Sequence, residues 1–140
     1  NARLDDLQAA ILRVKLPHLE AWNERRRELA ALYSTCLVGT GLTLPFEPPQ
    51  TRHVYHQYVV RHPWREALAV YLAGRGIQTR VHYPVPAHLQ PAYRSLPRGP
   101  LPVTEAISNE VIGLPIHPEM TAEDVKYICQ AIHQFLTTMR

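Results

Sequence analysis

Apolar residues recur at helical spacing along the first part of the chain. Most successive members of this stripe are three or four residues apart, which is the period of one helix face. Pro17 interrupts the pattern, because it cannot donate a backbone hydrogen bond and its ring clashes with the preceding turn, so we expect a kink or a break near Leu16. Gly39 and Gly41 favour the end of the helix. The pattern predicts a long kinked helix over residues 1–38, and its apolar stripe consists of Leu4, Leu7, Ile11, Val14, Leu19, Trp22, Leu29 and Tyr33.

Farther along the chain, short stretches rich in valine, isoleucine and tyrosine predict strands. The first runs from about Val54 to Arg61, where apolar and polar residues partly alternate. The second is "IQTRVHY" at 77–83, and a third lies near Ile112 to Ile116. We therefore expect a short sheet of about three strands.

Helices are predicted between these strands and after them. Pro63 suits the first turn of a helix that two glycines end, and a short helix leads into the third strand. Thr121 is the expected N-cap of the last helix, with Asp124 three residues on, close to a capping box. The pattern fits an α+β fold whose core spans residues 52–140 and whose helices cover the sheet. The predicted buried stripe of the last helix is Val125, Ile128, Cys129, Ile132 and Leu136.

The length and composition suit a single domain with a hydrophobic core. The chain has 140 residues, of which 46% are hydrophobic. No apolar run approaches the ~18 residues that span a bilayer, and no segment has the order of a signal peptide. Cys36 and Cys129 show no metal-type spacing, so buried free thiols are favoured and a disulfide is the alternative. These features predict a cytoplasmic protein without a membrane partner.

The charge of the chain is modestly basic, with a formal net charge of +3. Arginines are scattered among acidic neighbours, as in "WNERRREL", where Arg25, Arg26 and Arg27 are expected to pair with glutamates on a solvated helix face. This distribution does not favour a nucleic-acid partner. A small basic excess does suit an anionic small ligand, because guanidinium binds phosphate in bidentate fashion.

Eight histidines raise the question of a metal site. His53 and His56 are three residues apart on a predicted strand, which points them to opposite faces. Two prolines separate His82 from His88. Neither HExxH, CxxC nor GxSxG occurs in the chain. We therefore expect no metal ion and no serine-hydrolase triad.

Two stretches carry the candidate chemistry. "VHYPVPAHLQPAY" at 81–93 is either a rigid surface loop whose rings cover the core, or a stiff arm that presents His82, Tyr83 and His88 to a ligand. Asn1 and Arg3 precede a helix, where backbone amides and the helix dipole attract anions, so they are either phosphate contacts or ordinary cap residues.

Four segments, in order along essentially the whole chain, resemble one family. They are "NARLDDLQAAILRVKLPHLEAWNERRRELA", "VYHQYVVRH", "GIQTRVHYPVPAHLQPAY" and "GLPIHPEMTAEDV". They are similar to the C-terminal part of the DegT/DnrJ/EryC1/StrS family of pyridoxal-phosphate-dependent nucleotide-sugar aminotransferases. The resemblance implies that residues 1–140 are the small C-terminal domain of a fold-type-I aminotransferase with its connecting helix.

The resemblance also implies a function and partners. Such enzymes move an amino group from an amino acid, commonly glutamate, to a keto-sugar linked to a nucleoside diphosphate. They carry a large domain that binds pyridoxal phosphate, and they act as homodimers with active sites at the subunit interface. "RVKLPHLEAWN" and "HYPVPAHLQPAY" look most like members that act on 3-keto sugars.

The resemblance assigns roles to five residues. Asn1 matches an asparagine that reaches the cofactor phosphate of the neighbouring subunit, and Arg3 matches an arginine near cofactor phosphate or substrate. His82 and Tyr83 match a pair at the mouth of the active site that holds the nucleotide sugar, and His88 is a further candidate for that role.

The lysine that forms the Schiff base lies upstream of the Asn-x-Arg motif in such enzymes. Lys15 and Lys126, the two lysines here, match neither its position nor its context. Without that lysine the covalent chemistry has no anchor. We expect the large domain to be absent from this chain, no covalently bound cofactor and no catalytic activity of the chain alone.

Two other readings remain at this point. The chain is a stand-alone or truncated module that binds a nucleotide sugar or a partner without turnover, or its arginines bind nucleic acid with an affinity that falls steeply with salt. If the cofactor domain is missing, the helix face with Leu7, Ile11 and Val14 is exposed, and we expect self-association.

Overall fold

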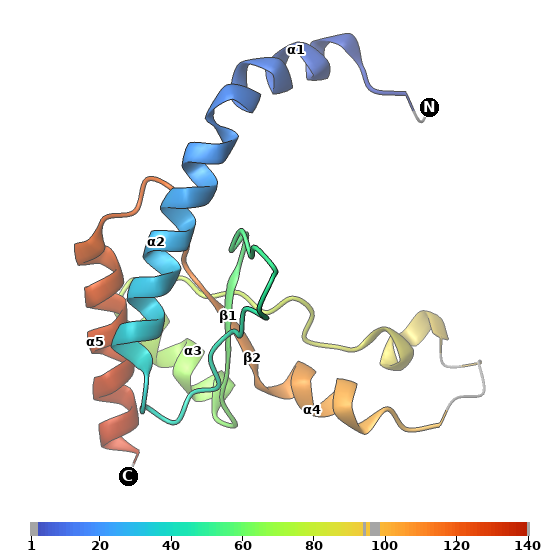
Figure 1. The fold of residues 1–140 in the computed structure, drawn as a ribbon. Helices are drawn as coiled ribbons and strands as arrows, with labels where there is room; N and C mark the ends of the chain where they lie inside the picture. The colour runs from blue at the N-terminus through green and yellow to red at the C-terminus, as the bar shows by residue number, and fades with distance from the viewer. Residues whose placement is uncertain (1–2, 94, 96–98, 140) are drawn as a thin grey trace.

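The chain begins with two helices that meet at a bend. The computed structural model describes residues 3–93, 95 and 99–139. Helix α1 spans Asp6–Lys15, a 3-10 turn η1 spans Leu16–His18, and helix α2 spans Leu19–Leu37. Pro17 lies inside the 3-10 turn, so the predicted kink near Leu16 is confirmed. Figure 1 shows α1 bending away from the rest of the molecule.

The two helices differ in what they bury. No residue of α1 is buried, whereas the second half of α2 packs into the core. Asp5 caps α1, because its side chain accepts a hydrogen bond from the backbone amide of Leu7 at 2.9 Å. The helix α2 ends at Leu37, and Gly39 follows with a φ of 76°, a backbone conformation that glycine adopts without strain.

The remaining elements form a small α+β core, and an arm, residues 81–110, extends from it. Helix α3 follows strand β1, two 3-10 turns lie in the arm, helix α4 returns to strand β2, and helix α5 closes the chain. Their bounds are β1 Tyr58–Arg61, α3 Arg65–Ala73, η2 Ala87–Leu89, η3 Pro91–Tyr93, α4 Pro102–Glu110, β2 Val111–Leu114 and α5 Ala122–Thr138.

Within the described residues the sheet has two strands, not the three expected. Strand β1 pairs antiparallel with β2. The segment 77–83 contacts β2 only through one bridge, in which Arg80 and Gly113 exchange both backbone hydrogen bonds. In that register Gln78 would face Pro115, which has no amide hydrogen to donate, so the ladder cannot grow in that direction.

The same chemistry shortens the predicted strands at their ends. Strand β2 stops at Leu114 because Pro115 follows, although the pattern extended it to Ile116. Strand β1 begins at Tyr58, not near Val54, because Tyr55 adopts a positive φ of 46° that does not occur in a strand.

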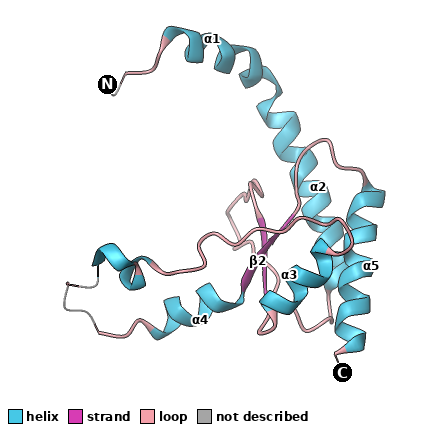
Figure 2. Ribbon diagram, turned by 180° about the vertical axis from the view of Figure 1, so that it is seen from behind, coloured by secondary structure: helices cyan, strands magenta, loops and turns pink. Residues whose placement is uncertain are grey.

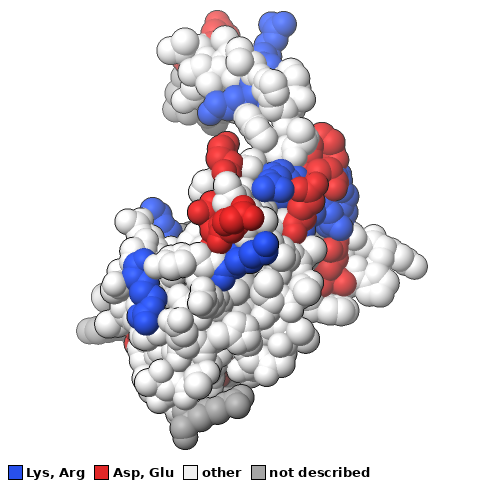
Figure 3. Space-filling view, turned by 90° about the vertical axis from the view of Figure 1, so that its left-hand side faces the viewer, with Lys and Arg blue, Asp and Glu red and all other residues white. Residues whose placement is uncertain are grey.

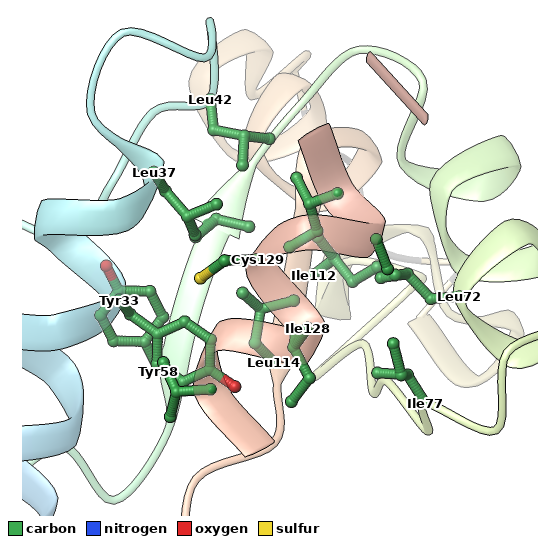
Figure 4. Close-up of a cluster of buried hydrophobic side chains, with 14 of the residues drawn as sticks. Tyr33, Leu37, Leu42, Tyr58, Leu72, Ile77, Ile112, Leu114, Ile128 and Cys129 are labelled. Carbon is green, nitrogen blue, oxygen red and sulfur yellow. The ribbon is translucent and has the colours of Figure 1, made fainter. Parts of the chain in front are cut away.

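One face of the sheet belongs to the core. Tyr58 and Val60 of β1, with Ile112 and Leu114 of β2, are buried and face helices α2, α3 and α5 (Figure 4). Tyr33 of α2 stacks on Tyr58 with ring centroids 4.8 Å apart. Helices α2 and α5 lie side by side in both ribbon views (Figures 1 and 2). The α+β fold with helices covering the sheet is therefore confirmed.

The other face of the sheet is partly open. Val59 and Arg61 of β1 and Val111 and Gly113 of β2 point away from the core and are only half-buried. From this side the chain runs outward after Arg80 and returns through α4, as Figure 2 shows. We call residues 81–110, within the described residues, the arm.

Helix α5 matches its prediction closely. Thr121 and Asp124 form a capping box, since the Thr121 side chain accepts from the Asp124 amide and the Asp124 side chain accepts from the Thr121 amide. The predicted stripe is buried except for Leu136, which is partly buried. Cys129 and Cys36 are free thiols, as expected, and burial raises the pKa of Cys129 to about 12.

The charged surface is mixed in sign. Acidic and basic side chains are interspersed over the upper part of the face shown in Figure 3, and the lower part is mostly uncharged. Of the run at 25–27, Arg25 pairs with Glu28 as expected, but Arg27 pairs with Glu47. The carboxylates of Glu20 and Glu24 both bind Arg52 instead, because the loop before β1 folds back onto α2.

Among the described residues there is no helix that is long and apolar enough to cross a membrane. The same residues hold no group of three or more histidine, cysteine or acidic side chains arranged to bind a metal ion.

Candidate functional site

Two neighbouring hollows on the open side of the sheet share the side chain of His82. The first, which we call the polar hollow, has a volume of about 510 Å³. The second, the apolar hollow, has a volume of about 530 Å³. Polar groups that line the polar hollow come from His56, Gln57, Gln78, Arg80, His82 and His117. Apolar groups that line the apolar hollow come from Val59, Tyr83, Val85, Pro86, Ile107 and Val111.

The bridge between Arg80 and Gly113 of the sheet holds the backbone of His82 in place. Arg80, two residues earlier, donates its amide to the Gly113 carbonyl at 3.1 Å and accepts from the Gly113 amide at 2.7 Å. A Cβ atom on residue 113 would lie 3.1 Å from the Arg80 carbonyl oxygen, so glycine permits this close approach. The backbone that carries His82 is therefore anchored to β2.

The ring of His82 contacts the side chain of Gln57, the residue directly before β1. The Gln57 side-chain amide lies 3.0 Å from Nδ1 of His82. With the Gln57 amide nitrogen donating, Nδ1 accepts, and the neutral ring carries its proton on Nε2. His82 can then donate a hydrogen bond through Nε2 to a hydroxyl or phosphate oxygen of a ligand.

Tyr83 stands at the rim of the apolar hollow. Its side chain is 77% exposed, and its ring meets that of His82 edge-on with centroids 5.9 Å apart. An exposed tyrosine offers a flat apolar ring and a hydroxyl at low conformational cost, a combination that suits ligand contact. The structure thus brings together His82 and Tyr83, two of the residues predicted from the sequence.

His88 lies elsewhere in the arm. Its side chain is only 5% exposed, and its Nε2 atom lies 3.0 Å from Oε1 of Glu105 in α4. The same carboxylate oxygen accepts from the Leu101 amide at 2.9 Å. These two contacts, the His88 hydrogen bond first, hold the pKa of Glu105 below its usual value. His88 is not one of the residues that line either hollow.

Of the two predicted cofactor contacts, the structure describes only Arg3. Asn1 falls outside the described residues. Arg3 is exposed and precedes α1, the helix that bends away from the core (Figure 1). Neither hollow is lined by a lysine, because Lys15 ends α1 and Lys126 lies on the exposed side of α5.

Five polar residues of the polar hollow were not selected from the sequence. His56 and Gln57 directly precede β1, and His117 follows β2 by three residues. Gln78 and Arg80 lie in the bridged segment. The antiparallel register pairs Tyr58 with Leu114, so the segments flanking this end of both strands must come together. Polar residues just outside two paired strands are the signal that would have found His56, Gln57 and His117.

Comparisons with known proteins identify relatives over nearly the whole chain. A family profile described as the DegT/DnrJ/EryC1/StrS aminotransferase family matches residues 1–133. The chain is 44% identical over 96% of its length to a dTDP-3-amino-3,6-dideoxy-alpha-D-galactopyranose transaminase of Aneurinibacillus thermoaerophilus. It is 43% identical, again over 96%, to a dTDP-3-amino-3,4,6-trideoxy-alpha-D-glucose transaminase of Streptomyces venezuelae.

Solved structures agree with these relatives. The crystal structure of S. venezuelae DesV in complex with a ketimine intermediate superposes with a TM-score of 0.90 at 42% identity, covering 96% of this chain and 37% of that one. A family aminotransferase from Brucella abortus gives a TM-score of 0.88 at 34% identity, covering 95% of this chain and 36% of that one.

The match covers only part of each relative. The chain spans 37% and 36% of the lengths of the two transaminases above. The resemblance of the four sequence segments is confirmed, and members of the matched family are pyridoxal-phosphate-dependent aminotransferases in general. The chain therefore belongs to the DegT/DnrJ/EryC1/StrS aminotransferase family and corresponds to its C-terminal part.

Proposed function

We propose that this chain is the small domain of an enzyme that transfers an amino group from an amino acid, glutamate in the first instance, to a nucleotide-linked keto-sugar. In this proposal residues 1–38 are the connecting helix, and residues 52–140 form the α+β core. The observation that carries it is the position of His82 and Tyr83, side by side at the junction of two hollows on the open face of the sheet.

The names of three relatives support the substrate class. Those from A. thermoaerophilus and S. venezuelae are named as transaminases of dTDP-linked 3-amino sugars. A 40% identical relative from Pseudomonas aeruginosa is named as an aminotransferase of UDP-2-acetamido-2-deoxy-3-oxo-D-glucuronate. We propose a 3-keto sugar on a nucleoside diphosphate as the acceptor.

The residues of the site suit a role in holding the sugar. His82 offers Nε2 as a donor, with its ring orientation set by Gln57. Tyr83 offers its hydroxyl and a ring over the apolar hollow. The prolines that follow His82 and Tyr83 stiffen the arm, so less conformational entropy is lost when a hydroxyl-rich ligand binds. For His88 the contact with Glu105 supports a positioning role, in which it fixes the arm and does not touch the sugar.

The cofactor of the family does not fit the described hollows as a covalent group. Pyridoxal phosphate, when bound to a lysine, acts as an electron sink for the transferred amino group. No lysine lines either hollow, so we propose that this chain does not hold the cofactor covalently and is inactive alone. Asn1 and Arg3 are proposed to contact the cofactor phosphate, since a helix start and a guanidinium both favour anions. The functional enzyme is proposed to be a homodimer.

A reduction experiment tests the covalent part of this proposal. We expect that borohydride treatment of the chain with pyridoxal phosphate labels Lys15 and Lys126 no faster in the folded state than in urea, as peptide mass spectrometry would show. Fast, selective labelling of either lysine in the folded chain would contradict it.

Ligand binding tests the substrate part. We expect the chain to bind dTDP-glucose or UDP-N-acetylglucosamine, and Tyr83→Ala to weaken this binding about tenfold, the loss of one stacking and hydrogen-bonding contact. The matched control is Tyr127→Ala, because Tyr127 is also an exposed tyrosine, at 51%, but lies on α5 and lines neither hollow. Equal affinities of the two variants in calorimetry would refute the role of Tyr83.

The second candidate function is a binding module without turnover. The absence of a lysine from both hollows favours it. The coding sequence upstream of Asn1 separates the two: an in-frame cofactor domain with its lysine supports the enzyme, and a nearby start codon supports the module.

A further inference from the structure

We propose that the polar hollow is a phosphoanion subsite in which Arg80 is the main contact. The inference rests on the proposed function only for the kind of molecule that carries the phosphates, a nucleoside diphosphate. The sequence motifs pointed to His82 and Tyr83, and they gave no role to Arg80.

In the part of the chain that the structure describes, Arg80 has no carboxylate partner, unlike five other arginines around the core. Within the described residues its exposed guanidinium forms no hydrogen bond and no ion pair, although its backbone is bonded to Gly113. By contrast, an acidic side chain contacts each of Arg25, Arg27, Arg52, Arg61 and Arg65. The charge of Arg80 is thus left available at the polar hollow that it lines.

The position of Arg80 is fixed although its side chain is exposed. Both backbone groups of Arg80 bond to Gly113 at 2.7 and 3.1 Å, and the 3.1 Å approach that a Cβ on residue 113 would make excludes larger residues there without a shift. A guanidinium on an anchored backbone loses less freedom when it binds a ligand than one on a mobile loop.

The lining of the polar hollow is suited to an anion with many oxygens. No aspartate or glutamate is among its lining residues, although the Glu119 carboxylate lies 3.1 Å from Nδ1 of the lining residue His117. Amide and imidazole groups of Gln57, Gln78, His56 and His82 line the same hollow as Arg80. A diphosphate can accept from several of these groups at once, whereas a carboxylate offers only two oxygens.

The neighbouring apolar hollow favours a ligand that joins phosphates to a ring. His82 lines both hollows, so a ligand that fills one is in reach of the other. Val59, Val111 and Tyr83 offer flat or apolar surface to a sugar or base. A nucleoside diphosphate or its sugar conjugate has this division of polarity within one molecule.

The test compares four probes by calorimetry on the same chain: inorganic pyrophosphate, uridine diphosphate, uridine and glutamate. We expect pyrophosphate and uridine diphosphate to bind, uridine and glutamate to bind at least tenfold more weakly, and added salt to weaken the phosphate probes. Arg80→Gln should weaken the binding of both phosphate probes about tenfold or more. Arg80→Lys should keep only part of the wild-type affinity, because lysine lacks the bidentate fork.

Arg13→Gln is the matched control, since it removes the same charge from exposed helix α1. The inference would be overturned if the phosphate probes did not bind, or if their affinity fell equally in Arg80→Gln and Arg13→Gln. So would Arg80-dependent binding of glutamate in preference to pyrophosphate.

The same variants separate this inference from the proposed function. If a nucleotide sugar binds through Tyr83 but Arg80→Gln has no effect, the function stands and the subsite is wrong. If pyrophosphate depends on Arg80 but a nucleotide sugar binds no better than uridine diphosphate and ignores Tyr83→Ala, the subsite stands and the function is wrong.

Discussion

Tyr33 connects the core to the polar hollow. Its side chain is fully buried, and its hydroxyl donates to the Pro115 carbonyl at 2.9 Å. Desolvation by burial raises the pKa of Tyr33 well above its usual value, so the phenol stays a donor. Pro115 itself lines the hollow, so this single hydrogen bond fixes the chain where it leaves β2.

Removing that hydroxyl should destabilise the fold measurably. We expect Tyr33→Phe to lower the free energy of unfolding by about 1 kcal/mol, because the buried Pro115 carbonyl loses its donor while the ring still packs. Urea unfolding measures this. Tyr127→Phe removes a 3.2 Å hydrogen bond from a half-exposed tyrosine to the Arg75 carbonyl. This variant should change the free energy of unfolding by less than about 0.5 kcal/mol. Equal losses in the two variants would contradict the role given to Tyr33.

The Cys129 thiol should be unreactive in the folded chain. It is 3% exposed, and burial raises its pKa to about 12, so very little thiolate exists at pH 8. We expect iodoacetamide at pH 8 to label Cys129 only after unfolding in urea, as peptide mass spectrometry would show. A Cys36→Ala variant isolates the signal of Cys129. Rapid labelling of the folded variant would show that the thiol is accessible.

At the scale of elements, a contact between η2 and α4 joins the two sides of the arm. Glu105 accepts from His88 and from the Leu101 amide, and both lower its pKa from the ordinary 4.5. A carboxyl group with a lowered folded-state pKa stabilises the structure above its unfolded pKa, and this stabilisation is lost as pH falls through the folded value. The arm should therefore loosen only in acid, below pH 4.5.

The Leu101 amide reports this titration directly. In NMR we expect its proton shift to titrate with a midpoint below 4.5 and to move toward 4.5 in His88→Ala, because the largest cause of the lowered pKa is then gone. Glu105→Gln should abolish the titration and serves as the control. A midpoint that His88→Ala leaves unchanged would show that the His88 contact does not form in solution.

Local chemistry made some elements predictable from the sequence. Pro17 placed the kink, Thr121 with Asp124 placed the start of α5, and the apolar stripe of α5 was found because it recurs at helical spacing. The extent of the strands was harder to predict. Whether "IQTRVHY" pairs beyond one bridge depends on Pro115, which lies more than thirty residues farther along the chain and acts only once the register is set.

The same division holds for the site. His82 and Tyr83 were selected because they belong to one short motif, and their rings meet edge-on, but their role stays a prediction. Arg80 lines the same hollow as His117 only through the pairing of distant segments, so no local pattern marks Arg80. His88 was selected for its place in the motif, yet its side chain is turned to Glu105, which sequence spacing could not reveal.

At the scale of the molecule, the exposed face of α1 is the most prominent apolar feature. Leu7 and Val14 are 70% and 72% exposed, and Ile11 is 48% exposed. An apolar stripe of this kind is costly in water. We expect the chain to self-associate through it.

Sedimentation at several concentrations tests this expectation. The average mass should rise with concentration, and a double variant, Leu7→Glu with Val14→Glu, should shift the chain toward monomer without changing its unfolding midpoint by much, because neither side chain is buried. The same charge change at exposed Val70 and Val103 is the control. A monomer at every concentration would disprove self-association through this face.

The central claim is that the junction of the two hollows at His82 and Tyr83 receives a nucleotide-linked sugar. The most direct measurement is an NMR titration of the isotope-labelled chain with such a ligand. The account predicts that shift changes concentrate at His82, Tyr83, Arg80 and Gln57 and reach neither α1 nor the exposed side of α5. Saturable changes elsewhere with none at these four residues, or no changes at millimolar ligand, would contradict it.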